Sequence, residues 1–328
     1  MTDLTRPTAG RRLIELCIEY NFIVIFIAVA AIATILSPNF LTATNIANLF
    51  QQAAVTGVVA VGMTFVILTG NIDLSVGSVC ALCGMVAAVL LAAGWPIWAA
   101  ILVAIAAGAI CGAVTGAITA LADVPSFIVS LAGLVSFRGL TFLLTDGVPV
   151  SGLPAGFAAI ASTQIPLAPG FALSSMAVFF LALCLLAGAL LRLTVVGESI
   201  YATGGNPEAA RLSGLPTRAV LILVFTLSGV TSALAGILLT SRLRIGQPTA
   251  AQGLELDAIA AVVLGGTSLF GGRGGVLGTF FAVMLLQVLR NIFNLLGLGS
   301  FYQMTVTGLI IVAAILLNRF IDLRRGRG

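Results

Sequence analysis

Long apolar stretches separated by short polar ones make up almost the whole chain. Ten can be distinguished, six before and four after a polar region at residues 192–218. A helix that crosses a bilayer needs about 20 mostly apolar residues. The pattern therefore predicts an all-α, polytopic membrane protein with about ten transmembrane segments in a single domain, residues 1–328. The expected segments are residues 17–36, 53–69, 76–93, 97–121, 126–145, 173–193, 217–240, 257–270, 275–297 and 301–318.

Two of these segments are interrupted by glycine and polar residues, after residue 68 and after residue 264. Unwound backbone at membrane depth has to face protein or water, because each unpaired N–H or C=O group costs several kcal/mol in lipid. We therefore expect broken helices that line a translocation pathway. The candidate pathway residues are Asn71, Asp73, Ser75, Arg138, Gly265, Gly266, Thr267 and Ser268.

The interruptions can also be explained without a pathway. Asp73 and Asp257 would then cap helix ends at the membrane interface. For Asp73 the two interpretations are equally supported. Asp257, which stands beside Glu255 at the start of a segment, is better explained as a cap.

Taken as two halves of five, residues 17–145 and 173–318, the ten segments predict that any repeat of the first half in the second is inverted with respect to the membrane. One local similarity supports this inverted-repeat permease fold. Residues 66–70 (VILTG) resemble residues 262–266 (VVLGG), and both runs end an apolar stretch that is short for a membrane helix.

Two arginines lie inside expected segments, Arg138 in the fifth and Arg290 in the ninth. An unpaired arginine at that depth is costly, so each should face a carboxylate, a cluster of backbone carbonyls or water. Because few carboxylates are available, Asp73 is the proposed partner of Arg138.

The central polar region has the features of a short helix with defined ends. Asn206 is suited to cap the first N–H groups, Pro207 to the first helical position, Glu208 to the positive N-terminus and Gly214 to the end. Such a helix either docks onto a partner or lies on the lipid surface.

Three other stretches carry predictions. Residues 38–52 offer Thr44 as a cap and predict a short helix along the outer interface. Residues 146–172 contain four prolines and no arginine, and predict an ordered outer loop. The spacing Gly108-x-x-x-Gly112-x-x-x-Gly116 predicts a packing face, within one subunit or between two.

Composition excludes several functional classes. Only 8% of residues are charged, against about 25% in soluble domains. The chain contains neither lysine nor histidine, so it cannot form the GxxxxGK[ST] loop of a conventional ATPase. Without histidine, Cys80-x-x-Cys83 is better explained by two small residues on one helix than by a metal or redox pair. We predict no catalytic residue, no metal site and no binding of nucleic acid.

The arginines are unevenly divided between the two sides of the membrane. An even number of segments places the tails, residues 1–16 and 319–328, on one side together with the central loop, residues 194–216. Eleven arginines fall on that side, and only Arg242 and Arg244 on the other. Because cytoplasmic loops carry the excess of positive charge, both termini are expected in the cytoplasm.

Several runs resemble the ribose-type permease subunits of bacterial ABC importers for monosaccharides. The resemblance covers nearly the whole chain in order, and branched-chain amino acid permeases match these runs less well. The runs are residues 60–82 (AVGMTFVILTGNIDLSVGSVCAL), 125–147 (PSFIVSLAGLVSFRGLTFLLTDG), 201–215 (YATGGNPEAARLSGL) and 255–275 (ELDAIAAVVLGGTSLFGGRGG), with the shorter runs 36–40 and 294–304.

This resemblance implies a subunit in the bacterial inner membrane that pairs with a second copy of itself or with a close paralogue. A periplasmic binding protein would deliver the sugar, and a cytoplasmic ATPase with two nucleotide-binding cassettes would bind ATP and Mg²⁺, so that this chain is not itself an enzyme and needs no cofactor. The central helix would couple the permease to the ATPase. The coupling residues would be Gly204, Gly205, Asn206, Pro207, Glu208, Ala209, Ala210, Arg211, Ser213 and Gly214.

Alternative functions stay open at this point. The family's substrates include ribose, arabinose, xylose, galactose and autoinducer-2, and the permease sequence does not choose among these or other small solutes. An ion-coupled secondary transporter would also have inverted repeats and broken helices, but the absence of histidine and the few membrane carboxylates argue against ion or proton sites. A scaffold subunit that transports nothing would not need paired helix breaks.

Overall fold

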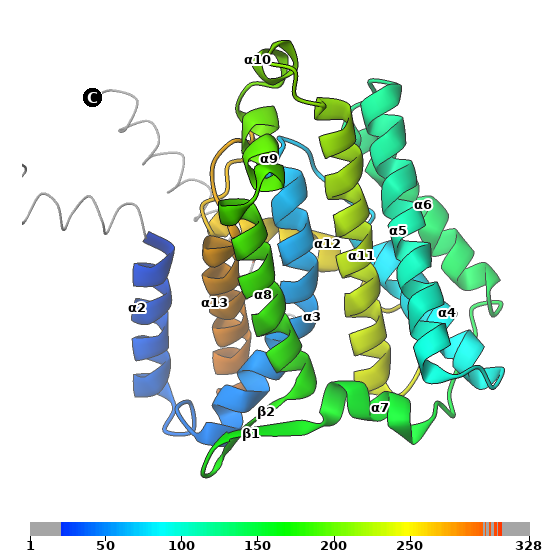
Figure 1. Cartoon of the computed structure of the whole chain (residues 1–328). Coiled ribbons are helices and arrows are strands. Elements are labelled where there is room, and N and C mark those ends of the chain that lie inside the picture. Colours follow the sequence, from blue (N-terminus) through cyan, green and yellow to red (C-terminus); the bar gives the residue numbers. More distant parts are fainter. Residues whose placement is uncertain (1–20, 298, 300–301, 303–304, 307, 310–328) are drawn as a thin grey trace, which may run out of the picture.

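The computed structural model describes residues 21–297, 299, 302, 305–306 and 308–309. In these ranges the chain forms twelve helices and one two-stranded sheet (Figure 1). The two expected tails and most of the tenth expected segment lie outside the described residues. The elements are α2 (Asn21–Leu36), α3 (Ala43–Leu68), α4 (Val76–Ala92), α5 (Ile97–Leu121), α6 (Ser126–Leu143), α7 (Ala155–Ser162), β1 (Gln164–Ala168), β2 (Phe171–Ser174), α8 (Ser175–Leu193), α9 (Val195–Gly205), α10 (Pro207–Leu212), α11 (Thr217–Leu243), α12 (Leu254–Leu264) and α13 (Val276–Leu295).

The helices agree with the apolar pattern. Each of the first nine expected segments contains a helix. Six of them, α3, α5, α6, α8, α11 and α13, are long and apolar enough to cross a membrane, so the chain is a multi-pass membrane protein. The other three are shorter, and the shortest is α12, whose 11 residues span roughly 16 Å, about half the thickness of the hydrocarbon core.

The separate interfacial helix predicted at residues 38–52 is wrong. α3 is one helix of 26 residues that continues through this region, and its cap is Thr42 instead of Thr44. Two polar side chains of this region bind inside the protein. Asn45 exchanges amide hydrogen bonds with Asn291 (2.9 and 3.0 Å), and Gln287 donates to Gln52 (2.9 Å).

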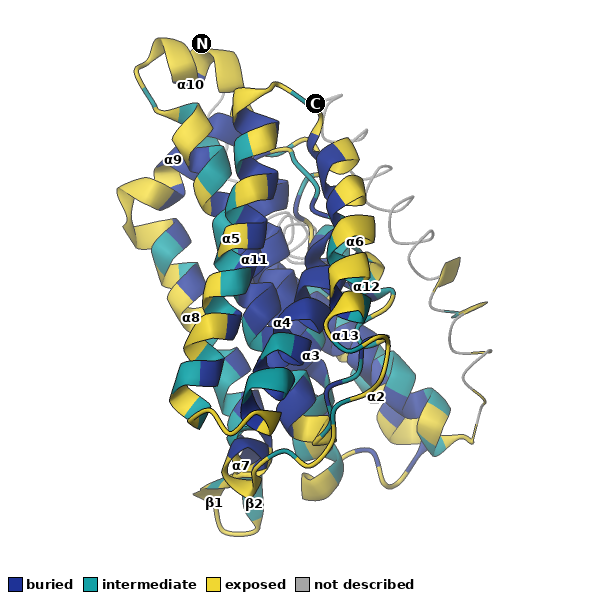
Figure 2. Ribbon diagram, turned by 90° about the vertical axis from the view of Figure 1, so that its right-hand side faces the viewer, coloured by how far each residue is buried: buried dark blue, intermediate teal, exposed yellow. Residues whose placement is uncertain are grey.

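The core is built around α3, α4 and α11. Figure 2 shows the buried residues concentrated on these helices, with the exposed ones on the outer faces of α5, α6 and α8. α5 packs closely on α11 through the predicted glycine face. A Cβ atom on Gly108 would lie 2.5 Å from the carbonyl oxygen of Gly229, and one on Gly112 would collide with that of Phe225. This face is therefore used within one chain.

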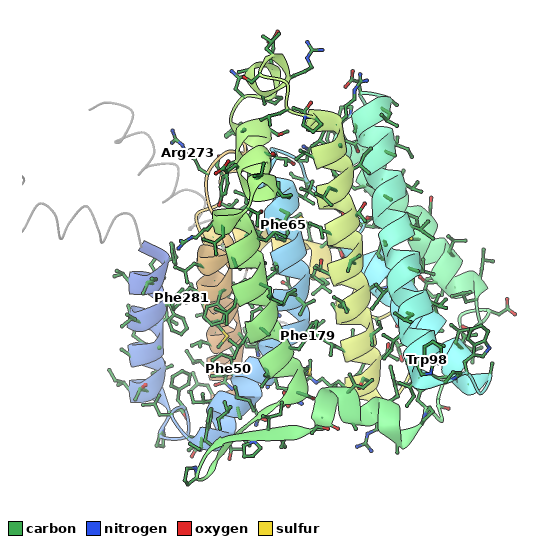
Figure 3. All side chains as sticks on the ribbon, viewed as in Figure 1. Phe50, Phe65, Trp98, Phe179, Arg273 and Phe281 are labelled. Carbon is green, nitrogen blue, oxygen red and sulfur yellow. The ribbon has the colours of Figure 1, made fainter. Side chains whose placement is uncertain are left out.

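Aromatic rings attach α2 to the rest of the helices. The ring of Phe281 on α13 lies 6.1 Å from that of Phe22 and 5.6 Å from that of Phe26, between centroids (Figure 3). Phe280 extends the cluster to Phe180 on α8, at 5.8 Å. Such contacts suit a helix whose outer side faces lipid, because they need no polar partner.

The outer loop is ordered, as predicted, although it contains strands as well as a helix. α7 is followed by the hairpin of β1 and β2, which a turn of Pro169 and Gly170 closes (φ of Gly170, 78°). The all-α prediction therefore misses a small antiparallel sheet. Figure 1 shows α7 and the hairpin at one end of the molecule and α10 at the other.

Candidate functional site

The first interruption begins where α3 ends. Gly70 adopts a φ of 75°, in the left-handed region that favours glycine. The N–H groups of Gly70 and Asn71 donate back to the carbonyls of Ile67 (2.9 Å) and Val66 (3.3 Å), an arrangement that ends many helices. The half-buried Asn71 amide donates to the carbonyl of Thr69 (3.0 Å). This side chain therefore stabilises the turn and keeps some exposure to solvent.

Asp73 is buried, with 2% of its surface exposed. Its Oδ1 accepts hydrogen bonds from the N–H (3.0 Å) and the hydroxyl (2.6 Å) of Ser75, and its Oδ2 accepts one from the hydroxyl of Ser228 on α11 (2.8 Å). The first two bonds hold the carboxylate in the turn just before α4, whose N-cap is Ser75, and the third ties it to a distant helix. Asp73 is therefore not the N-cap of α4, and it links this turn to α11 across the core.

The second interruption repeats the backbone geometry of the first. α12 ends at Leu264 with Gly265 as its C-cap, and Gly266 adopts a φ of 83°. The N–H groups of Gly266 and Thr267 donate to the carbonyls of Val263 (3.0 Å) and Val262 (3.2 Å), as those of Gly70 and Asn71 do at the equivalent positions. The similarity noted between residues 66–70 and 262–266 therefore corresponds to the same helix ending.

Thr267 and Ser268 shape the loop that follows. The hydroxyl of the buried Thr267 accepts a hydrogen bond from the N–H of Gly275 (3.3 Å), and the N–H of Ser268 donates to the carbonyl of Arg273 (2.9 Å). Both bonds close the loop between α12 and α13. In this conformation the two residues hold the second interruption in place.

The two interruptions lie against each other. The N–H of Gly272 donates to the carbonyl of Leu68, the last residue of α3, at 2.9 Å. α3 and the α12 loop therefore meet at the same end of the molecule. The local similarity thus relates two helices that end together, and it does not test the predicted inverted repeat.

The proposed pairing of Arg138 with Asp73 is wrong. The guanidinium of Arg138 on α6 donates instead to the carbonyls of Pro248 (2.9 Å) and Ala250 (2.8 Å). These carbonyls belong to the segment before α12, where Ala251 has a φ of 58°. Arg138 thus binds a cluster of backbone carbonyls, one of the three surroundings expected for it. These bonds hold the segment that precedes α12.

Asp257 is not the cap of α12. The N-cap is Gly253, and Asp257 forms an ion pair with Arg290 of α13 (2.7 Å). The side chains are 27% and 31% exposed, respectively. The pair supplies the carboxylate that was expected for Arg290, and it joins the helices on either side of the second interruption.

The central polar region forms two helices, of which the second is the predicted one. The side chain of Asn206 accepts from the N–H of Ala209 (2.9 Å), and Pro207 occupies the first turn of α10. Gly214 follows with a φ of 84°. Ala209 is exposed, whereas Ala210 is 5% exposed and packs inside the chain. Sequence analysis did not distinguish these two alanines, and it missed α9, which Thr194 caps.

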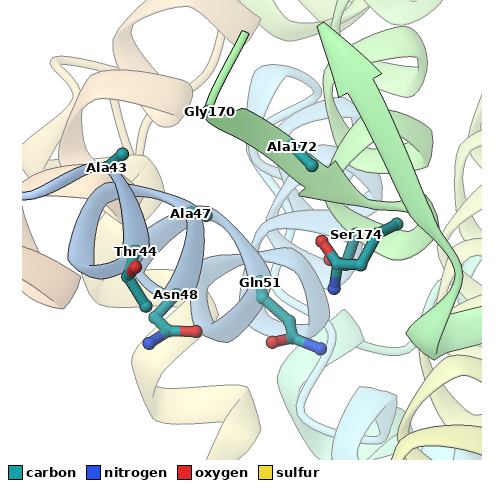
Figure 4. A pocket seen from close by; sticks show the side chains of 9 residues that line it. Ala43, Thr44, Ala47, Asn48, Gln51, Gly170, Ala172 and Ser174 are labelled. Carbon is teal, nitrogen blue, oxygen red and sulfur yellow. The ribbon is translucent and has the colours of Figure 1, made fainter. Parts of the chain in front are cut away.

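A shallow polar groove lies at the opposite end of the molecule, between the first turns of α3 and the hairpin (Figure 4). The residues that line it are uncharged. The prediction for residues 146–172 covered only the hairpin side of this surface. The polar side chains are Thr44, Asn48, Gln51, Gln164 and Ser174.

Sequence analysis missed Ser228, which binds the carboxylate of Asp73. It also missed Tyr201, whose hydroxyl donates to the carbonyl of Gly274 (2.9 Å). Ser228 stands among apolar residues, and a hydroxyl in such a run was the available signal. For Tyr201 the acceptor is a backbone carbonyl 73 residues away, and nothing in the local sequence indicates it.

Residues 45–315 match the family model described as branched-chain amino acid transport system / permease component. The ribose import permease protein RbsC of Bacillus subtilis (strain 168) is 44% identical over 91% of this chain and 91% of its own. RbsC of Haemophilus influenzae is 41% identical over 96% of each chain. The xylose transport system permease protein XylH of Escherichia coli (strain K12) is 36% identical over 90% of this chain and 91% of its own. No solved structure matches.

Proposed function

This chain belongs to the branched-chain amino acid transport system / permease component family, and we propose that it is the membrane-spanning permease subunit of an ATP-driven importer of a monosaccharide. The observation that carries the proposal is the similarity, over nine-tenths of the chain, to permeases named for ribose and xylose import. Ribose is the first substrate to test, and autoinducer-2 or another small solute is the alternative.

We infer that ATP is hydrolysed on a separate cytoplasmic subunit, which binds the nucleotide and its Mg²⁺. The absence of lysine supports this inference, because a conventional phosphate-binding loop requires one. α10 is the proposed docking element. Its Glu208, Ala209 and Arg211 are exposed, so a groove on a partner could receive them.

The proposed orientation places α10 in the cytoplasm, and the hairpin in the periplasm of a bacterial inner membrane. Arg211 lies on α10, and Figure 3 shows Arg273 in the loop near α9. At the other end of α11, Ser241 binds α7 and precedes Arg242 and Arg244. With both termini in the cytoplasm, the distribution of the described arginines agrees with the rule that cytoplasmic loops carry the excess of positive charge.

Transport by the assembled complex tests the proposal. We expect proteoliposomes that contain this permease, its ATPase and its binding protein to accumulate labelled D-ribose only when ATP and Mg²⁺ are supplied to the ATPase side. Vesicles with the permease alone and an ion gradient are the control. Uptake into those control vesicles would contradict the proposal and favour an ion-coupled transporter.

We further predict that the complex contains two permease subunits, identical or closely related. The glycine face of α5 does not support a second subunit, because it packs against α11 of the same chain. The ion pair of Asp257 and Arg290 does support it, since half-exposed charges on α12 and α13 would be costly against lipid. A second subunit beside these helices, with the pathway between the copies, would cover them. Native mass spectrometry of the detergent-extracted complex measures the number of permease subunits per ATPase. A complex with one permease per pair of nucleotide-binding cassettes would contradict this prediction.

A further inference from the structure

Four glycines from three segments meet backbone to backbone next to α10, at what we term the glycine junction (Gly70, Gly204, Gly271 and Gly272). Gly70 follows α3, Gly204 lies in the last turn of α9, and the other two belong to the loop after α12. A Cβ atom on Gly204 would collide with the carbonyl oxygen of Leu68 and would lie 2.8 Å from the amide nitrogen of Gly272. The three segments can approach this closely only because these positions lack side chains.

The loop after α12 is fitted to α9 from its own side as well. A Cβ atom on Gly271 would lie 2.7 Å from the carbonyl oxygen of Gly204 and 2.8 Å from the amide nitrogen of Gly70. Gly271 and Gly272 adopt φ angles of 83° and 72°, which residues with a side chain rarely adopt. Both interruptions therefore touch α9 at one point.

Tyr201 forms a second link between α9 and the same loop. Its hydroxyl donates to the carbonyl of Gly274 at 2.9 Å. A tyrosine phenol is protonated at neutral pH, and burial raises the pKa of the Tyr201 phenol further, so the hydroxyl is a donor. Since Tyr201 lies almost one turn before Gly204, the two contacts fix both the position and the rotation of the end of α9.

α9 leads directly into α10. Asn206 donates its N–H to the carbonyl of Ala202 in α9 (3.2 Å) and caps α10 with its side chain. A displacement of α10 therefore reaches Gly204 through two residues of hydrogen-bonded chain. No flexible linker separates the docking element from the junction.

We propose that the glycine junction transmits movement of α10 to both helix interruptions at once, with Gly204 and Tyr201 as positioning residues. The proposal rests on the proposed function, because it assumes that an ATPase moves α10. When α10 shifts, α9 carries the end of α3 and the α12 loop with it. These two segments lead into the candidate pathway residues other than Arg138, which lies on α6, so the junction connects ATP hydrolysis to the pathway.

Two helical glycines provide a matched pair of variants. Gly204→Ala places a methyl group against Leu68, whereas a Cβ atom on Gly188 of α8 would meet no atom within 4 Å. In proteoliposomes with the ATPase, the binding protein and labelled D-ribose, we expect Gly204→Ala to weaken the coupling of import to hydrolysis. The number of ribose molecules imported per ATP should fall by about tenfold, within the usual range of coupling between sites. Gly188→Ala should keep the wild-type ratio.

Tyr201→Phe is the second variant, and it decides the question if Gly204→Ala does not accumulate. It removes only the hydroxyl, and we expect the ratio to fall by about two- to fivefold, as the loss of a single hydrogen bond allows. The proposal is overturned if Tyr201→Phe and any folded Gly204→Ala both import the wild-type number of ribose molecules per ATP. It is also overturned if Gly188→Ala lowers that number as much as Gly204→Ala does. If the wild-type complex does not import ribose at all, it is the proposed function that fails.

Discussion

Replacing Asp73 by Leu is expected to remove most of the folded chain from the membrane. The change leaves the buried hydroxyls of Ser75 and Ser228 without their acceptor, at a cost of about 1–3 kcal/mol for each. It also forces a branched apolar side chain into a site built for a carboxylate. Together these losses are comparable with a total stability of about 5–15 kcal/mol. The measurements are the amount of chain in the membrane fraction and its thermal unfolding in detergent.

Two variants separate this structural role from a role in the pathway. Asp73→Asn keeps an oxygen that can accept from Ser75, so it should accumulate close to the wild-type level. Asn71→Leu should also fold, because Asn71 is half-buried and, among the described residues, its side chain binds only to Thr69, but its sugar uptake should fall. Normal accumulation of Asp73→Leu with normal uptake would show that the buried network is dispensable.

Replacing Ala209 by Trp is expected to detach the ATPase, or uncouple it, and to reduce uptake by at least about tenfold. Ala209 is exposed on α10, so a large side chain there would prevent close approach of a partner without disturbing the core. Charge reversal at Glu208 or Arg211 should weaken the same contact. Co-purification with a tagged permease measures attachment, and hydrolysis stimulated by the binding protein measures coupling.

The control for this experiment is Ala219→Trp, at an exposed alanine in the first turn of α11. It adds the same bulk near the same end of the molecule, and we expect it to keep the ATPase. Ala210→Trp is unsuitable as a docking test, because Ala210 is buried and the change would disturb α10 itself. If α10 only lies on the lipid surface, Ala209→Trp will behave like Ala219→Trp.

Local structure could be predicted where the residues that make it are close in sequence. The cap at Asn206, the glycine endings after residues 68 and 264, and most helix positions all follow from short patterns. The docking role of α10 and the pathway role of Asn71 stay predictions, because they depend on partners and on a second conformation.

Long-range polar pairing could not be predicted in the same way. Ser228 lies 155 residues from Asp73, and the acceptors of Arg138 are backbone carbonyls, which every residue possesses. The separate helix at residues 38–52 failed for a related reason. The amides of Asn45 and Gln52 pair with amides on α13 inside the protein, and local sequence does not indicate such distant partners.

The position of α11 has a consequence for how the protein is made. This helix packs against α3, α4 and α5, all of which are synthesised before it. Until α11 emerges, the glycine surface of α5 has only lipid or the insertion machinery to pack against, and Asp73 lacks Ser228. Membrane insertion of the first half can therefore precede its final packing by about a hundred residues of translation, which at about 5–20 residues per second amounts to several seconds. During this interval the nascent chain is inserted but not yet assembled, and it is then that a membrane protease or a chaperone could act on it.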